Sequence, residues 1–306
     1  MLSSEVIAVL LSECVKTWID ARTLSRAPST ISGYKRLLRL YITGTRVGGM
    51  DIADLDGSDM IELLAPLIRR GCTRQAQLLQ ILVSAALRQA VRRRLLSWSP
   101  MDEVDRVSHV PRITPWLSVE QARQLLSSSA ATEDPYYIAW LLMLCCGLRR
   151  GEMLALRWSD IDRARSELHI ERQRIDVDGV VQVTRPKSRS SVRVIPLDDA
   201  LLKQIPLHPG KDEDILLGVS RTMLSDGLDR AISRAGVPRV TLHGLRHTMA
   251  ATAAGDGVSI KILQTLMGHA HYQTTADIYA HVNQEPRIQA AKLITHSLLD
   301  ARLEIV

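Results

Sequence analysis

The sequence predicts a mainly α-helical protein with one small antiparallel β-sheet, an α+β fold. Apolar residues recur at helical spacing through the first hundred residues, and the helical pattern returns from Arg221 to the end. The strand signal is confined to about 167–197, where ELHIERQRI and VVQVT flank Asp178 and Gly179. This dipeptide is typical of a two-residue hairpin turn, and a third strand, SVRVIPL, follows it.

Four helices are expected before residue 98. The first two are marked by apolar residues three or four apart within 6–18 and 31–41. The third follows Asp56 or Ser58, either of which could cap it, and ends at Gly71. The fourth, TRQAQLLQILVSAALRQAVRRRLL, is long and amphipathic and ends in a basic cluster.

A stretch with three prolines, from Trp98 to Trp116, interrupts the helical pattern and predicts a linker. Ser118 then begins a further helix, with Gln121 at the capping-box position. We therefore expect a helical domain at 1–98, a linker at 99–115 and a second domain at 116–283. Residues 284–306 are expected to form a C-terminal helix and tail.

Composition narrows the class of protein. The net charge is +6, and most of it lies in residues 1–112, where 16 Lys and Arg oppose 11 Asp and Glu. This balance favours an anionic partner.

The four cysteines form no CxxC pair, which favours free thiols. No run approaches the roughly 20 apolar residues that span a bilayer, and Glu5 and Glu13 interrupt the apolar N-terminus. We expect a cytoplasmic protein without a membrane partner.

Several residues of the second domain suit attack on a phosphodiester. They are Arg149, Lys187, His243, Arg246, His269 and Tyr279. Two guanidinium groups can hold the nonbridging oxygens of a phosphate and oppose the developing charge. A tyrosine hydroxyl has a reference pKa of about 10, so it needs a base or a cationic setting to attack. A lysine can protonate the departing sugar oxygen. No acidic cluster indicates a metal, and no cofactor is expected, because cations would replace magnesium.

Each of these residues, taken singly, also has a structural interpretation. Arg149 and Arg150 could begin a solvated helix, and Tyr279 could be a packed aromatic with a hydrated hydroxyl. His243 and His247 lie four apart on an expected helix and could bind zinc, but they lack the glutamate of HExxH.

The order and spacing of the motifs resemble the tyrosine recombinase family, which includes phage integrases and bacterial chromosome-dimer resolvases. The motifs are GLRRGEMLALRW, HGLRH, LMGH and a tyrosine ten residues after that last histidine, and the resemblance covers about 115–283. It implies that the six residues above form the active site and that Glu152 supports Arg149. Two positions depart from the family pattern: Met249 stands where Phe is frequent, and His271 where Ser is frequent.

The resemblance also implies a reaction and an assembly. Tyr279 would form a 3′-phosphotyrosine on double-stranded attachment or recombination sites, and two rounds of strand exchange would pass through a Holliday junction held by a homotetramer. A directionality factor is a further candidate partner. Residues 1–112 resemble the family's core-binding domain, and the resemblance implies that the second domain is the catalytic domain. Candidate DNA contacts are Lys35, Arg36, Arg39, Arg92, Arg93, Arg94, Arg185 and Arg189.

Three alternatives remain open at the level of sequence. A type IB topoisomerase uses the same chemistry, although the small size, the LMGH motif and the separate helical domain favour recombination. A chromosome or plasmid dimer resolvase differs only in its DNA site. A non-catalytic DNA-binding protein would not need all six residues. The chain is expected to lack an arm-type DNA-binding domain, which favours integration of a phage or other small mobile element. Its C-terminal helix is expected to dock on a neighbouring protomer.

Overall fold

The computed structural model describes residues 8–110, 114–186, 188–207 and 214–268, except for the side chain of Arg189. These residues form two compact units. One takes in the described residues up to 110 together with Asp176–Val180, and the other takes in the remaining described residues. Each unit is described by itself.

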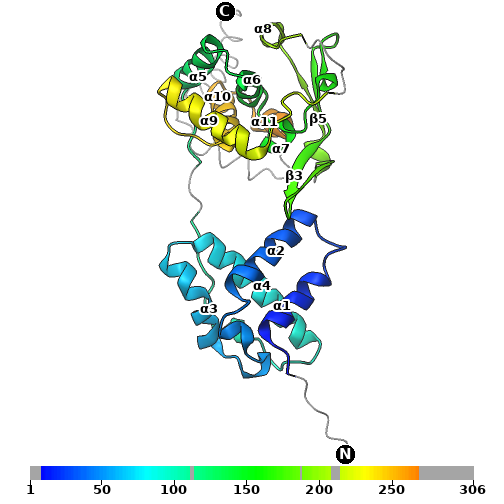
Figure 1. Ribbon diagram of the computed structural model, residues 1–306, viewed down its shortest axis with the longest axis vertical. Helices are drawn as coiled ribbons and strands as arrows, with labels where there is room; N and C mark the ends of the chain where they lie inside the picture. The colour runs from blue at the N-terminus through cyan, green and yellow to red at the C-terminus, as the bar shows by residue number, and fades with distance from the viewer. Residues whose placement is uncertain (1–7, 111–113, 187, 208–213, 269–306) are drawn as a thin grey trace, which may run out of the picture. The chain divides into compact units, whose positions relative to one another are not determined.

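The first unit is built from α1–α4 and three short 3₁₀ helices (Figure 1). Their bounds are α1 Leu11–Asp20, α2 Pro28–Tyr41, η1 Val47–Gly49, η2 Ile52–Asp54, α3 Gly57–Arg69, α4 Thr73–Arg92 and η3 Pro100–Glu103. The long helix α4 packs against α1, α2 and α3. Its buried residues include Leu79, Leu82, Val83 and Leu87, whose spacing of three or four places them on the faces that meet the other helices.

Local signals set the ends of α3 as the sequence predicts. Asp56 is its N-cap, and its carboxylate accepts from the Asp59 N–H in a capping box. Gly71 follows the helix with a φ of 68°, a left-handed conformation that costs glycine little. Four helices before residue 98 are thus confirmed.

The segment after Trp98 does not leave the first unit at once. Pro100 and Met101 are buried, and η3 packs on α3 and α4. The buried amide of Gln80 then donates to the Asp105 carbonyl (2.9 Å) and accepts from the Val107 N–H (2.8 Å). The first half of the expected linker is therefore fixed to the helical unit.

The second unit surrounds the apolar helix α6. Its helices are α5 Val119–Ala131, α6 Tyr137–Cys146, α7 Arg150–Met153, α8 Asp199–Gln204, α9 Arg221–Ala235, α10 Leu242–Gly255 and α11 Ile260–Met267. All the apolar residues of α6 from Ile138 to Leu144 are buried, because α5 and α10 cover it. Ser118 caps α5 in the predicted capping box with Gln121.

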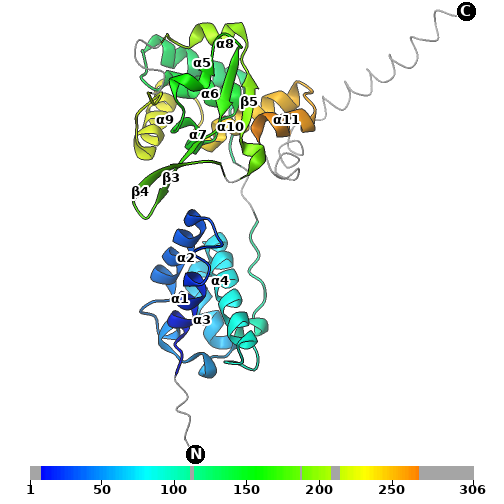
Figure 2. The ribbon, with the colours of Figure 1, turned by 90° about the vertical axis from the view of Figure 1, so that its right-hand side faces the viewer.

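The strands form two small sheets where the sequence predicted one. Their bounds are β1 Ile161–Asp162, β2 Glu167–Ile170, β3 Gln173–Val177, β4 Val180–Thr184 and β5 Arg193–Pro196, with short helices η4 Trp158–Asp160 and η5 Arg189–Ser191. The antiparallel order β1-β2-β5 makes one sheet, and β3 and β4 form a separate ribbon around Asp178 and Gly179 (Figure 2). The expected strand ELHIERQRI is interrupted at Arg172, whose guanidinium turns to bind the Asp160 carboxylate.

The predicted fold class is nevertheless confirmed, since helices dominate and the sheets are small. Within the described residues, no helix is both long enough and apolar enough to cross a membrane.

Candidate active site

The end of α6 places Arg149. Gly147 closes the helix in a left-handed conformation, with a φ of 63°, and Arg149 follows in extended backbone as the N-cap of α7. The backbone N–H of Arg149 donates to Glu152 Oε2 (2.9 Å), and its guanidinium donates to Glu152 Oε1 (2.7 Å). Glu152 is buried, whereas the Arg149 side chain is 31% exposed. The turn GLRRGE thus fixes the arginine through its own glutamate.

The same glutamate binds a second arginine. Arg193, on β5, donates to Glu152 Oε1 (3.1 Å) and Oε2 (3.0 Å), and both side chains are almost fully buried. Burial alone would raise the pKa of Glu152. The hydrogen bonds and charge of Arg193, followed by the N–H and charge of Arg149, instead hold that pKa below its usual value. Glu152 is therefore an anion that joins α7 to β5.

A third arginine, Arg246 on α10, is completely buried. Its guanidinium donates to the Gly147 carbonyl and to the Met267 carbonyl (2.6 Å). Its Nε is buried and has no hydrogen-bond partner among the described residues. Burial, followed by repulsion from Arg149, lowers the pKa of Arg246 to about 9. Arg246 therefore remains cationic at neutral pH although no described carboxylate binds it.

The three arginines converge on the C-terminal end of α11. Arg193 Nε donates to the Leu266 carbonyl (2.7 Å), Arg246 to the Met267 carbonyl (2.6 Å) and Arg149 to the Gly268 carbonyl (2.6 Å). These carbonyls have no partner within the helix and lie at the negative end of its dipole, so they are good acceptors for guanidinium groups. Three consecutive residues, the last two of α11 and its C-cap Gly268, thus bind arginines from three separate elements, and the next residue in the chain is His269.

Gly268 permits this convergence. Its φ is 64°, and a Cβ at this position would lie 2.8 Å from the Ser190 carbonyl oxygen and 3.1 Å from Ser191 Cα. Only glycine therefore allows the end of α11 to approach η5 so closely.

Two histidines lie on the first turns of α10. The rings of His243 and His247 meet edge to face, with centroids 4.6 Å apart. Burial, followed by the charges of His247 and Arg246, lowers the pKa of His243 to about 4, and burial also lowers the pKa of His247. Both imidazoles are thus neutral at pH 7. No third His, Cys, Asp or Glu joins them as a metal ligand in the described part of the chain.

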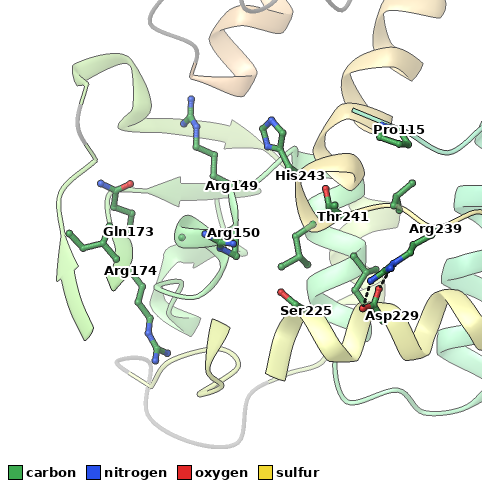
Figure 3. A pocket seen from close by; sticks show the side chains of 15 residues that line it. Pro115, Arg149, Arg150, Gln173, Arg174, Ser225, Asp229, Arg239, Thr241 and His243 are labelled. Carbon is green, nitrogen blue, oxygen red and sulfur yellow. Dashed lines mark hydrogen bonds and ion pairs between the residues drawn. The ribbon is translucent and has the colours of Figure 1, made fainter. Parts of the chain in front are cut away.

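A pocket of about 810 Å³ opens beside these groups. Arg149 and His243 lie at one end of it, and Arg150 projects between the β3 side and the α9–α10 side (Figure 3). Arg246 does not line this pocket. The arrangement offers an anion a cationic recess with neutral imidazole as a further hydrogen-bonding group.

Several predicted site residues lie outside the described residues. They are Lys187, His269, Tyr279, His271 and the expected C-terminal helix at 284–306. The side chain of Arg189 is outside as well, and Arg185 is exposed after β4. The structure brings Arg149, Glu152, His243 and Arg246 together from motifs almost a hundred residues apart.

Residues 115–285 match the phage integrase family over more than half of the chain. The chain belongs to the phage integrase family. The tyrosine recombinase predicted from motif order is thereby confirmed. A tyrosine recombinase described as XerC-like, from Caldanaerobacter subterraneus subsp. tengcongensis, is 26% identical over 94% of this chain and 83% of its own length.

Solved structures of integrases show the same fold. The Tn1549 transposon integrase, in complex with a circular intermediate DNA, has a TM-score of 0.76 at 20% identity, covering 93% of this chain and 99% of that one. The lambda integrase tetramer bound to a Holliday junction has a TM-score of 0.69 at 17% identity, covering 89% of this chain and 78% of that one.

Arg193 is the residue of this recombinase site that the motifs did not reveal. One signal could have found it: in RVIPL, alternation places Arg193 on the same face as Ile195, which is buried. A charged residue on the buried face of a strand needs a partner, and Glu152 was the available acid. Ser191 also joins the network, because its hydroxyl accepts from Arg149 (3.3 Å).

The basic candidates of the first unit are exposed. Lys35, Arg36 and Arg39 lie on α2, and Arg92, Arg93 and Arg94 lie at and beyond the end of α4. Arg22 and Arg26 follow α1 and belong with this second group. Burial lowers the pKa of Arg22, and the positive charges of Arg92, Arg26 and Arg93 lower it further. Arg22 also stacks on Trp18, with its Cζ 3.8 Å from the ring centroid.

The neutral state of His243 predicts a pH dependence of stability. Its pKa is lowered from 6.5 to about 4 in the folded chain. Between these values the unfolded chain binds a proton that the folded chain does not, so the free energy of unfolding falls as the pH drops through this window. Urea unfolding across the window should give a steeper fall for the wild type than for His243→Gln. Equal slopes would contradict a neutral His243.

Replacement of Gly268 should disrupt the site. Gly268→Ala places a Cβ against the Ser190 carbonyl and costs about 1–2 kcal/mol for the left-handed backbone alone. We expect a lower free energy of unfolding and loss of DNA cleavage. Gly179→Ala, a left-handed glycine with open space around it, is the matched control and should keep cleavage. Wild-type cleavage by Gly268→Ala would show that the close approach is not needed.

Removal of Arg193 should be strongly destabilising. Arg193→Met leaves Glu152 with only Arg149 and removes the donor to the Leu266 carbonyl, and breaking a buried ion pair costs about 3–5 kcal/mol. Arg165→Met, which breaks an exposed pair with Asp162, should cost at most about 1 kcal/mol. Urea unfolding measures both variants, and similar midpoints for the two would contradict the buried network.

Proposed function

We propose that this protein is a site-specific DNA recombinase that cleaves and rejoins strands through a covalent bond between DNA and Tyr279. The convergence of Arg149, Arg246 and His243 carries the proposal, since these residues belong to motifs far apart in the chain. Arg149, Arg193 and Arg246 carry three positive charges, whereas Glu152, the one described carboxylate that binds any of them, carries a single negative charge. An enzyme that stabilises a phosphorane-like transition state needs such a surplus of fixed positive charge.

Arg149 and His243 line the pocket, so they would contact the scissile phosphate directly. Arg149 has the partly exposed guanidinium that this contact needs. A neutral His243 would donate a hydrogen bond to a nonbridging oxygen without adding a charge. Arg246 is buried beside them and would contribute chiefly through its charge, since its own donors are bound to carbonyls.

The remaining roles fall on residues outside the described ranges. The Tyr279 oxygen would attack phosphorus, forming the 3′-phosphotyrosine and breaking the bond to the 5′ oxygen. Lys187 would donate a proton to that leaving oxygen, and His269 would support the phosphate or take up the proton that the Tyr279 hydroxyl loses. Attack by the 5′-hydroxyl of a partner strand then reverses the step, so the phosphodiester is restored without an external energy source.

The biological role that we propose is integration of a phage or another mobile element by a homotetramer acting through a Holliday junction. Support comes from the likeness to an integrase of a transposon and to the lambda integrase tetramer on a Holliday junction. A directionality factor would then choose between integration and excision. The exposed arginines and lysine of the first unit, with Arg185 and Arg189, would contact DNA phosphates.

Trapping the covalent intermediate tests the proposal. A nicked suicide substrate loses the short strand that carries the 5′-hydroxyl, so the wild type should accumulate a protein–DNA adduct. Tyr279→Phe should form none, and Arg149→Gln should form at least a hundredfold less, as expected for loss of a donor at a developing charge. Gel electrophoresis under denaturing conditions measures the adduct.

Three outcomes would contradict the proposal. An adduct with Tyr279→Phe would assign the nucleophile elsewhere, and no adduct with the wild type would favour a non-catalytic DNA-binding protein. Relaxation of supercoiled plasmid without recombined products would favour a topoisomerase. Sequencing the joined ends separates integration of an element from resolution of chromosome or plasmid dimers.

A further inference from the structure

The pocket beside Arg149 contains a cation that no described residue neutralises. Arg150 lines the pocket, and its guanidinium makes no hydrogen bond or ion pair with any described residue. It projects between β3 and the α9–α10 side (Figure 3). An exposed arginine alone would be unremarkable, since most surface arginines are solvated. Arg150 differs from such arginines because it lines a pocket in which every other arginine has a partner.

Every other arginine that lines the pocket has a partner. Arg149 binds Glu152 and the Gly268 carbonyl. Arg174 donates to the Val219 carbonyl (2.7 Å), and Arg239 forms an ion pair with Asp229 (3.1 Å). Asp229 is the only carboxylate among the residues that line the pocket, and Arg239 already uses it.

Another cation lies close to Arg150 instead of an anion. Partial burial, followed by the charge of Arg221, lowers the pKa of Arg150, so the two guanidinium groups lie near enough to repel each other. The Arg221 side chain, at the start of α9, likewise has no hydrogen-bond or ion-pair partner among the described residues. Two like charges beside a cationic recess favour the binding of an anion from outside.

We propose that Arg150, with Arg221 beside it, binds a second phosphate of the DNA backbone, next to the phosphate that Arg149 and His243 hold. The site rests on the proposed function, because the strand that enters the pocket is the one to be cleaved. Arg150 would be a positioning residue. With the two phosphates that flank one sugar both bound, the DNA strand could not slide along the pocket, and phosphate contacts fix the register in other DNA-binding proteins in the same way.

Salt dependence of DNA binding gives the first test. Each neutralised phosphate contributes about 0.9 to the slope of log K against log salt concentration. On a mixed-sequence duplex, Arg150→Gln should lower the magnitude of this slope by about 0.9 and weaken binding whatever the sequence. Arg165→Gln is the control, because Arg165 is an exposed arginine that does not line the pocket, and it should keep the wild-type slope. A wild-type slope for Arg150→Gln overturns the proposal.

The second test replaces single phosphates of the DNA by uncharged analogues and so locates the phosphate that Arg150 contacts. Methylphosphonates are placed one at a time on the cleaved strand of the suicide substrate, and the rate of adduct formation is measured. A neutral group at the contacted position should slow the wild type but leave Arg150→Gln unaffected, since that variant has already lost the interaction. If Arg150→Gln and the wild type respond equally at every non-scissile position, the second phosphate site does not exist.

The two proposals can fail separately. No wild-type adduct, together with a lower slope for Arg150→Gln, would reject the recombinase chemistry and keep the phosphate site. A Tyr279-dependent adduct with an unchanged slope would reject the phosphate site alone. Arg150→Lys retains the charge, so it should restore the slope, whereas an effect due to misfolding would not be rescued.

Discussion

One buried carboxylate determines the arrangement of this site. Glu152 binds Arg149 from its own turn and Arg193 from β5, and it is the only acid in hydrogen-bond contact with either guanidinium among the described residues. Burying ions is costly unless each one is paired and hydrogen-bonded. Arg149 and Arg193 meet that requirement through Glu152, whereas Arg246 is bound only by the Gly147 and Met267 carbonyls. Carbonyl dipoles satisfy hydrogen bonds without cancelling a full charge, so the cluster keeps a surplus of positive charge while remaining folded.

A structural feature could be predicted from the sequence when the residues that interact to form it lie close together in the chain. The hairpin at Asp178 and Gly179, the cap at Ser118 and the end of α3 follow from a few adjacent residues, and the structure confirms them. The motifs identified the family because their order is specific. The division into two sheets was not predicted: the break between β2 and β3 coincides with a contact between Arg172 and Asp160, which no local pattern indicates.

Within the described part of the site, Arg149, Glu152, His243 and Arg246 lie together as the motifs predict, but the contacts of Arg246 differ from those expected. Arg246 was expected beside the phosphate, yet it is buried against the Gly147 and Met267 carbonyls. Arg193 was not expected, because its partner Glu152 lies 41 residues earlier in the chain. Both differences arise from tertiary packing around α11. The sequence predicts only that the helical pattern continues through α11, and nothing in that pattern indicates that the carbonyls at the end of this helix serve as acceptors.

The carbonyl contacts at Leu266, Met267 and Gly268 also require α11 to keep one rotational position relative to the three arginines. Successive residues of a helix differ by about 100° in direction, so the three carbonyls meet three arginines only in one rotational setting of the helix. Inserting or deleting one residue within α11 would turn all three away together, whereas a change of length in the connection between α10 and α11 could be absorbed there. The connection between α10 and α11 should therefore tolerate a change of length far more readily than the segment from Ile260 to Gly268.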